Sequence, residues 1–143
     1  DMVRECKRLL KPDAFAYYSI WGRPENCLPY TVIANNLKKF GVDLPNQRSN
    51  FHLSKHEKLR NLFERNGIEK YKIQNTFIPY NYAKGEDYLF MLKNGFNIDE
   101  IIKDCTEEQK NEIIRNIVKD VDNAINGEGF FGIETFIMRS AKF

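Results

Sequence analysis

The hydrophobic positions along the chain alternate between helical and extended spacing. Residues 2–10 place their apolar side chains on one side of a helix, and Pro12 requires that helix to end before it. Residues 14–21 are almost continuously apolar and aromatic, which predicts a strand covered on both faces. A helix followed by a buried strand is typical of an α/β layer. Because the helix begins with the first residues, we expect that further sequence precedes it.

Two more helices are predicted in the following third of the chain. The first has Pro29 in its first turn, places apolar residues between Tyr30 and Phe40 on one face, and is closed by Gly41. A polar, irregular loop over residues 42–50 separates it from the second helix. The second helix begins at Ser54, where the S-x-x-E sequence predicts a capping box, and Gly67 suits its C-terminal cap.

The remaining pattern predicts two strands separated by helices. Residues 68–79 alternate between apolar and polar side chains, as in a strand exposed on one face. A helical insertion over 80–129 follows, and its long last helix is opened by a second capping sequence at Thr106. Residues 130–143 are rich in aromatic and β-branched residues and predict a closing strand. Because a mean sheet has about five or six strands, three strands indicate part of a larger sheet.

Composition narrows the class of protein further. The 143 residues are 42% hydrophobic, which is enough for one compact domain with a core. The 22 basic and 20 acidic residues are interspersed and leave a net charge of +2, so nothing favours nucleic acid as a partner. The three widely spaced cysteines predict reduced thiols, and no apolar run has the length of a membrane span. We therefore expect a cytoplasmic location.

Three stretches of the chain carry a resemblance to a known family. Residues 5–12 (E-C-K-R-L-L-K-P) resemble the E-x-x-R-L-L-K-P-G-G segment before the fifth strand of class I S-adenosylmethionine-dependent methyltransferases of the ubiquinone/menaquinone-biosynthesis type. Residues 18–26 (Y-S-I-W-G-R-P-E-N) are similar to the S-V-W-G-x-P-E-N strand end of one branch of that family. Residues 51–68 are similar to its F-x-F-S-x-x-x-x-L-x-x-L-L-x-x-A-G-F segment before strand six. The departures are Asp13-Ala14 in place of G-G, and Asn66 in place of Ala.

The resemblance implies a partial Rossmann-like sheet. The family fold is a seven-stranded, mostly parallel sheet in which strand seven lies antiparallel between strands five and six. This chain, residues 1–143, would supply strands five, six and seven with flanking helices, and 80–129 would be the substrate-side insertion between strands six and seven. The Gly-rich turn after strand one, which would bind S-adenosylmethionine, is absent from this sequence. We therefore expect no cofactor-binding residue in this segment and no activity from it alone.

The resemblance also implies where a methyl acceptor would lie. In the family, substrate contacts come from the loop after strand five and from the insertion between strands six and seven. Because methyl transfer depends largely on orientation, no dedicated catalytic residue is required. Each candidate also has an ordinary explanation, since aromatic residues dominate protein cores. The substrate-facing candidates are Trp21, Asn26, Tyr30, Tyr80, Tyr82, Tyr88 and Met91.

Other chemically active side chains have simpler explanations. His52 and His56 are four residues apart, but His52 precedes the predicted helix start and no third ligand is near, so we expect no metal. Cys27 follows the predicted site loop, yet nothing nearby in the sequence lowers its pKa, and a small buried apolar role is favoured. The sequence thus predicts neither a metal site nor a nucleophilic cysteine.

Two further hypotheses remain beside that of a methyltransferase portion acting on a small molecule. The chain could be a non-catalytic interaction module that pairs with a partner through the open edge of its first strand. It could also complete its sheet by homodimerisation. The methyltransferase hypothesis requires the missing N-terminal half of the domain as a partner and S-adenosylmethionine as a cofactor. The methyl acceptor itself has no recognisable signature in the sequence.

Overall fold

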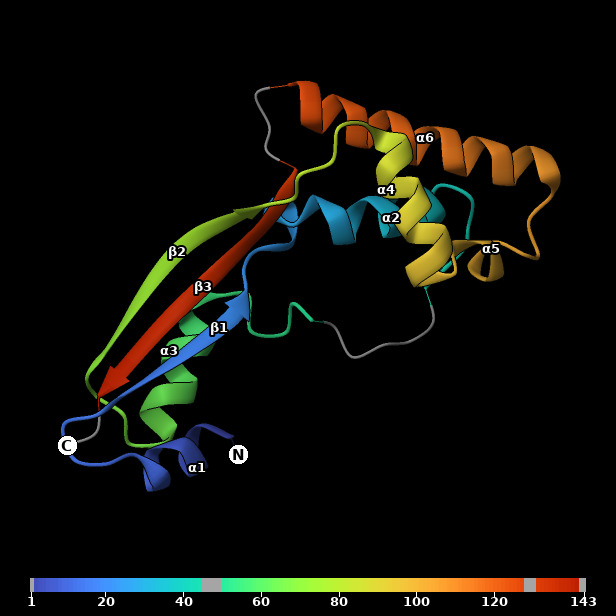
Figure 1. The fold of residues 1–143 in the computed structure, drawn as a ribbon. Helices are drawn as coiled ribbons and strands as arrows, with labels where there is room; N and C mark the ends of the chain where they lie inside the picture. Colours follow the sequence, from blue (N-terminus) through green and yellow to red (C-terminus); the bar gives the residue numbers. More distant parts are fainter. Residues whose placement is uncertain (1, 45–49, 128–130, 142–143) are drawn as a thin grey trace. The chain divides into compact units, whose positions relative to one another are not determined.

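The structure is a computed structural model that describes residues 2–44, 50–127 and 131–141. It is a mixed α/β protein with a small three-stranded antiparallel sheet and, in the described ranges, six α-helices (Figure 1). The chain forms two compact units. The sheet unit consists of Asp1–Asn26, Arg48–Ile78 and Ile133–Phe143, and the helical unit consists of Cys27–Gln47 and Pro79–Gly132.

The sheet has the strand order β1-β3-β2, so the last strand of the chain lies between the other two. These strands are β1 (Phe15–Trp21), β2 (Tyr71–Pro79) and β3 (Gly132–Ala141). β1 and β3 are antiparallel, with a register that runs from Phe15 opposite Ala141 to Trp21 opposite Thr135. Residues 45–49 of the predicted loop, and residues 130, 142 and 143 of the predicted closing strand, lie outside the described residues.

Two helices, α1 (Met2–Leu9) and α3 (His56–Arg65), cover one face of this sheet. Tyr18 points toward them, and its ring meets Phe63 of α3 edge-on with centroids 5.4 Å apart. The alternate residues Phe15 and Tyr17 are 47% and 66% exposed. The expectation that β1 is covered on both faces is therefore wrong for this unit, because both of its helices pack on the Tyr18 face.

The start of α3 differs from its sequence prediction. The N-cap is Lys55, in an extended conformation and without a side-chain capping bond, and the helix begins at His56. Ser54 is instead buried, with 8% of its surface exposed. The capping box predicted at Ser54 is wrong because the helix begins one residue later than that motif requires. The C-terminal cap is as predicted, with Gly67 at a φ of +65°.

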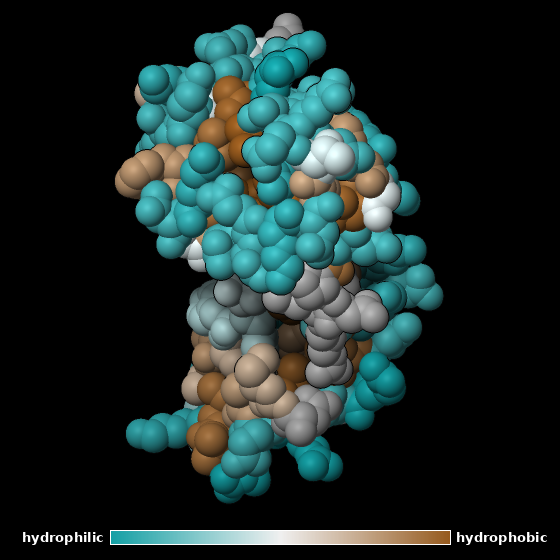
Figure 2. Space-filling model, turned by 90° about the vertical axis from the view of Figure 1, so that its right-hand side faces the viewer, coloured by the Kyte–Doolittle hydropathy of each residue, from teal (hydrophilic) through white to brown (hydrophobic). Residues whose placement is uncertain are grey.

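The helical unit is built from two separate stretches of the chain. It contains α2 (Leu28–Lys38), α4 (Gly85–Met91), a π-helix over Leu92–Phe96, α5 (Ile98–Ile101) and α6 (Glu107–Asn126). The capping box predicted at Thr106 is confirmed, since its side chain accepts from the backbone N–H of Gln109 and the Gln109 side chain accepts in return from the Thr106 backbone N–H. On the face drawn in Figure 2, most side chains of this unit are hydrophilic.

The core of the helical unit joins α2 to α6. Buried apolar residues of the two helices belong to one cluster, to which α4 and α5 also contribute. A polar contact crosses the same interface: the buried Asn36 amide donates to Asp120 Oδ2 at 2.8 Å and to the Val32 carbonyl at 3.0 Å. The sequence predicted a helical insertion over residues 80–129 alone. In the structure, α2 and its flanking residues belong to the same compact unit as that insertion.

Candidate functional site

The turn after β1 presses the main chain against β3. The Gly22 N–H donates to the Glu134 carbonyl oxygen at 2.7 Å. A Cβ atom added at Gly22 would lie 2.6 Å from Cγ of Glu134, so any larger residue would have to move this strand. Glycine at this position therefore sets how the chain leaves the carboxyl end of β1.

The next residue, Arg23, makes the main electrostatic contact of the sheet unit. Its Nε donates to Glu134 Oε2 at 2.9 Å and its Nη2 to Oε1 at 2.7 Å, while its backbone N–H donates to Oε2 at 2.8 Å. The Glu134 side chain is 8% exposed and that of Arg23 is 51% exposed. The hydrogen bond from the Arg23 side chain is the main cause that lowers the pKa of Glu134 to about 2, against the opposing effect of burial.

Two of the predicted substrate-facing residues lie in this same region. Asn26 ends a short 3-10 helix (Pro24–Asn26), and its side chain hydrogen-bonds to Glu134, which further lowers the pKa of that carboxyl. Trp21 is partly buried at the end of β1, and its ring meets Phe51 edge-on with centroids 5.5 Å apart. Sequence reasoning missed the Arg23–Glu134 pair because its members are 111 positions apart and no local pattern links them.

A cavity of about 270 Å³ opens beside this turn, within the sheet unit. Its walls are residues 23–25 after β1, residues 54–56 at the start of α3, Asn75 of β2 and Phe136 of β3. His56 is held there by two contacts: its Nε2 lies 3.0 Å from Asn75 Oδ1, and its ring meets the Phe136 ring at 4.7 Å. Polar side chains thus converge at the carboxyl end of β1.

The predicted tyrosines gather in the helical unit around Phe131. The hydroxyls of Tyr30 and Tyr80 are 3.0 Å apart. The rings of Tyr80, Tyr82 and Tyr88 each meet Phe131 edge-on, with centroids 5.1 to 6.2 Å apart. Burial is the main cause that raises the pKa of both Tyr80 and Tyr88 above the ordinary value. Four of the predicted substrate-facing residues therefore lie close together in the structure. One, Tyr30, comes from the segment after β1, and the other three come from the predicted insertion.

The members of this tyrosine cluster differ in exposure. Tyr88 is fully buried, and its hydroxyl donates to the carbonyl oxygen of Pro29, as in an ordinary core tyrosine. Tyr30, Tyr80 and Tyr82 are only partly buried. Met91 is also partly buried and packs against the same core. Of the candidates in this cluster, a ligand could therefore contact Tyr30, Tyr80, Tyr82 and Met91, whereas Tyr88 is inaccessible.

Metal-ligating and nucleophilic groups are dispersed in the part of the chain that the structure describes. No group of three or more His, Cys, Asp and Glu residues there could hold a metal ion. His52 lies in a turn before α3, whereas His56 is the first residue of that helix. The three cysteines, all within the described residues, form no disulfide, and Cys27 is fully buried.

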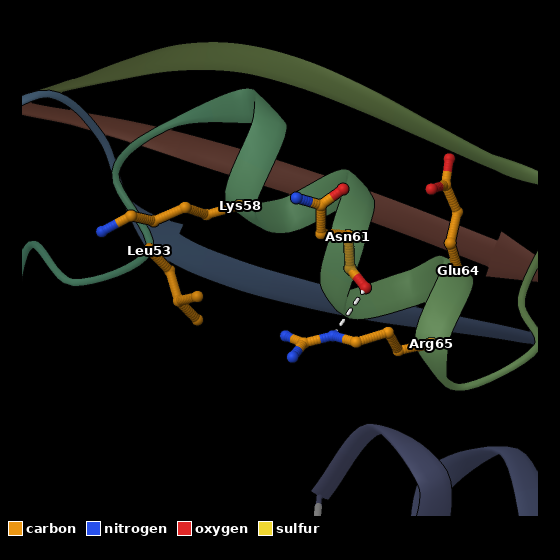
Figure 3. A pocket seen from close by; sticks show the side chains of 5 residues that line it. All are labelled: Leu53, Lys58, Asn61, Glu64 and Arg65. Atoms are coloured by element: carbon orange, nitrogen blue, oxygen red, sulfur yellow. Dashed lines mark hydrogen bonds between the residues drawn. The ribbon is translucent and has the colours of Figure 1, made fainter.

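Two other hollows lie on the sheet unit. The first, of about 460 Å³, follows the outer side of α3 beside Leu53, and its polar side chains point in different directions (Figure 3). Arg65 there folds back to donate to the Asn61 carbonyl at 3.1 Å. The second, of about 660 Å³, lies at the opposite end of the strands from Gly22, where the Arg139 guanidinium stacks 3.7 Å from the centre of the Phe15 ring.

Comparison with known proteins does not assign the chain to a family. No protein-family model matches the chain, and no curated protein matches it. None of the described helices combines the length and the apolar character needed to cross a membrane.

Proposed function

We propose that this chain is the C-terminal, substrate-side portion of a cytoplasmic class I S-adenosylmethionine-dependent methyltransferase that acts on a small molecule. In this proposal the donor-binding segments belong to an N-terminal half of the domain, and the chain is not competent alone. The observation that carries the proposal is the order of the three strands.

The last strand, β3, lies between the first two and runs antiparallel to β1. A chain of three consecutive strands most simply pairs each strand with the next in sequence. Here β1 and β2 are instead separated by a strand that arrives after a long helical insertion. The arrangement implied by the resemblance, with strand seven between strands five and six, has this order, which supports the assignment of β1, β2 and β3 to those positions.

The turn before β1 supports the same reading. Lys11 to Ala14 form a turn, with the Ala14 N–H donating to the Lys11 carbonyl at 3.2 Å, and the third residue, Asp13, has a φ of +61°. A turn with proline second and a positive φ third favours glycine at that third position. The family pattern K-P-G-G has glycine there. The departure at Asp13 thus retains the backbone conformation that the pattern requires.

Exposed aromatic side chains on the face of β1 opposite α1 and α3 support the proposal that another protein segment covers this strand. Phe15 and Tyr17 lie on that face with 47% and 66% of their surface exposed, and β1 is at the edge of the described sheet. Exposed aromatic residues on an unpaired edge strand favour association with another strand. In the proposed enzyme, the missing N-terminal half of the domain covers this edge and face.

The chemistry assigned to this chain is positioning. S-adenosylmethionine supplies an electrophilic methyl group, and the acceptor atom must be aligned behind it in a site that excludes water. The partly buried residues Tyr30, Tyr80 and Tyr82 offer aromatic surface and hydroxyl groups for such an acceptor, as does Met91 with apolar surface. Trp21 and Asn26 occupy the carboxyl end of β1, where ligands of open α/β sheets bind.

The proposal is tested by calorimetric titration with S-adenosylhomocysteine. We expect no saturable binding to the chain alone, and binding after the sequence encoded upstream of it is restored. Binding by the chain alone would contradict the missing-donor-site part of the proposal. An open reading frame that begins at Met2 would contradict the fragment itself.

A second candidate is an interaction module that completes its sheet with a partner or by homodimerisation, and the exposed aromatic side chains of β1 favour it. We expect Tyr17→Lys to abolish such an association in analytical ultracentrifugation. The matched control is Phe90→Lys, since Phe90 is 71% exposed but lies in the helical unit. Association that survives Tyr17→Lys would exclude β1 as the contact.

A further inference from the structure

Two hydroxyls in the core of the sheet unit are buried without a hydrogen-bond partner. In the part of the chain that the structure describes, they are the Tyr18 hydroxyl of β1 and the Ser140 hydroxyl of β3. Tyr18 is 8% exposed and Ser140 is 1% exposed. Because a buried hydroxyl has lost its hydrogen bonds to water, most such groups in proteins have a partner, and an exception calls for a redox or ligand-binding explanation. Two such hydroxyls in one core point to an acceptor atom that this place accommodates.

Both hydroxyls belong to the face of the sheet that α1 and α3 cover. Ser140 lies opposite Ala16 in the register of β1 and β3, and Ala16 is two residues before Tyr18, so the three residues share one face. Diagonal neighbours on adjacent antiparallel strands are within reach of an aromatic side chain. Tyr18 is part of the buried apolar cluster between the sheet and the two helices. The two unpaired donors therefore lie in the same layer.

Cys6 of α1 brings a thiol to this layer. It is partly buried and packs against the same cluster as Tyr18. Burial is the main cause that raises the pKa of Tyr18, and Ser140 and Cys6 act on this pKa as well, so the three side chains are neighbours. Because Cys6 keeps part of its surface exposed, a molecule as small as hydrogen peroxide can reach it.

We propose that Cys6 is a site of oxidation to the sulfenic acid by hydrogen peroxide, with the hydroxyls of Tyr18 and Ser140 as donors to the added oxygen. The thiolate of Cys6 attacks one peroxide oxygen and forms an S–O bond while the O–O bond breaks. The second oxygen leaves as hydroxide, so sulfur is oxidised and the peroxide is reduced. The new oxygen on sulfur is an acceptor beside two hydroxyl donors that the reduced protein leaves unpaired.

This inference goes beyond the proposed function and does not depend on it. Cys6, Tyr18 and Ser140 all belong to the sheet unit, and none of them is a substrate-facing candidate. The sequence predicted no nucleophilic cysteine, because the two hydroxyls meet the thiol only in the tertiary structure.

The test is a short pulse of hydrogen peroxide on the full chain, followed by dimedone, which labels sulfenic acids, and by peptide mass spectrometry. Cys105 is the internal control, because it is also partly exposed but belongs to the helical unit, which contains neither unpaired hydroxyl. We expect about tenfold more label at Cys6 than at Cys105, as two added hydrogen bonds would give. Iodoacetamide, which alkylates thiols without adding an oxygen to sulfur, should not show this preference. A labelling ratio near one, or an equal preference with iodoacetamide, would overturn the proposal.

Three variants test the assigned donors. Tyr18→Phe and Ser140→Ala each delete one hydroxyl and should each lower the preference for Cys6 about threefold. Neither hydroxyl has a partner to lose, so both variants should fold, and a dispersed amide NMR spectrum checks this. The matched control is Tyr71→Phe, which deletes a partly exposed tyrosine hydroxyl from β2 and should leave the preference unchanged. A preference that survives both hydroxyl deletions, or that the control lowers equally, would exclude the two donors.

Discussion

Replacing Glu134 with glutamine isolates the charge of the main ion pair of the sheet unit. Glutamine keeps the shape of the side chain, and its oxygen can still accept the hydrogen bond from the Arg23 backbone N–H. The variant therefore removes the negative charge that the Arg23 guanidinium contacts at 2.7 and 2.9 Å. Because Arg23 is half exposed, its own charge remains solvated in the variant.

The magnitude follows from the pKa of Glu134. Lowering this pKa from 4.5 to about 2 corresponds to about 3 kcal/mol of stabilisation at neutral pH. Solvent screening at the half-exposed Arg23 reduces this figure, and we expect Glu134→Gln to lower the free energy of unfolding by about 2 kcal/mol.

The sign of the pH dependence is set by the lowered pKa. A carboxyl with a folded-state pKa below its unfolded-state value contributes its full stabilisation above pH 4.5 and loses it as the pH falls toward 2. We therefore expect the difference between wild type and Glu134→Gln to be constant from pH 7 down to about pH 5. At pH 3 about half of it should remain.

Urea unfolding followed by tryptophan fluorescence measures this difference. The chain has a single tryptophan, Trp21, which lies at the end of β1 and so reports on the sheet unit. The matched control is Glu5→Gln, because Glu5 also pairs with an arginine, Arg8, but both side chains are exposed. We expect no measurable change from this control. A Glu134→Gln effect that is equal at pH 7 and pH 3, or no larger than that of the control, would refute the reasoning.

Four other substitutions, at three positions, test local contacts and backbone conformation through the free energy of unfolding in urea. Gly22→Ala should destabilise by about 1 to 3 kcal/mol, because its Cβ would overlap the Glu134 side chain, and a neutral result would mean that β3 yields easily. Asp13→Gly should stabilise by up to about 1 kcal/mol, because it relieves a positive φ of 61°, whereas Asp13→Val should destabilise. Tyr30→Phe should cost about 1 kcal/mol by leaving the Tyr80 hydroxyl without its partner 3.0 Å away. Because the Tyr30 hydroxyl helps to raise the pKa of Tyr80, spectrophotometric titration should show a lower pKa for Tyr80 in this variant.

Local sequence patterns predicted the elements of this fold well where short-range chemistry decides them. The capping sequence at Thr106 and the glycine cap at Gly67 depend on contacts within a few residues, and both are confirmed. The prediction at Ser54 is wrong because α3 begins at His56, one residue later than the motif requires, and Ser54 is buried in front of the helix. The tyrosines were chosen individually, and only packing around Phe131 shows that they form one cluster.

By itself, the sequence determined the kinds and order of the helices and strands, because hydrophobic spacing, proline and glycine act on neighbouring residues. The strand order, with β3 between β1 and β2, is the one that the family resemblance implied. Tertiary structure alone decided that the segment containing α2 joins the helical unit and that Arg23 pairs with Glu134. Each of these facts depends on residues far apart in the chain. Their contacts form only when burial of apolar surface brings the distant segments together, and no pattern along the chain records such a meeting.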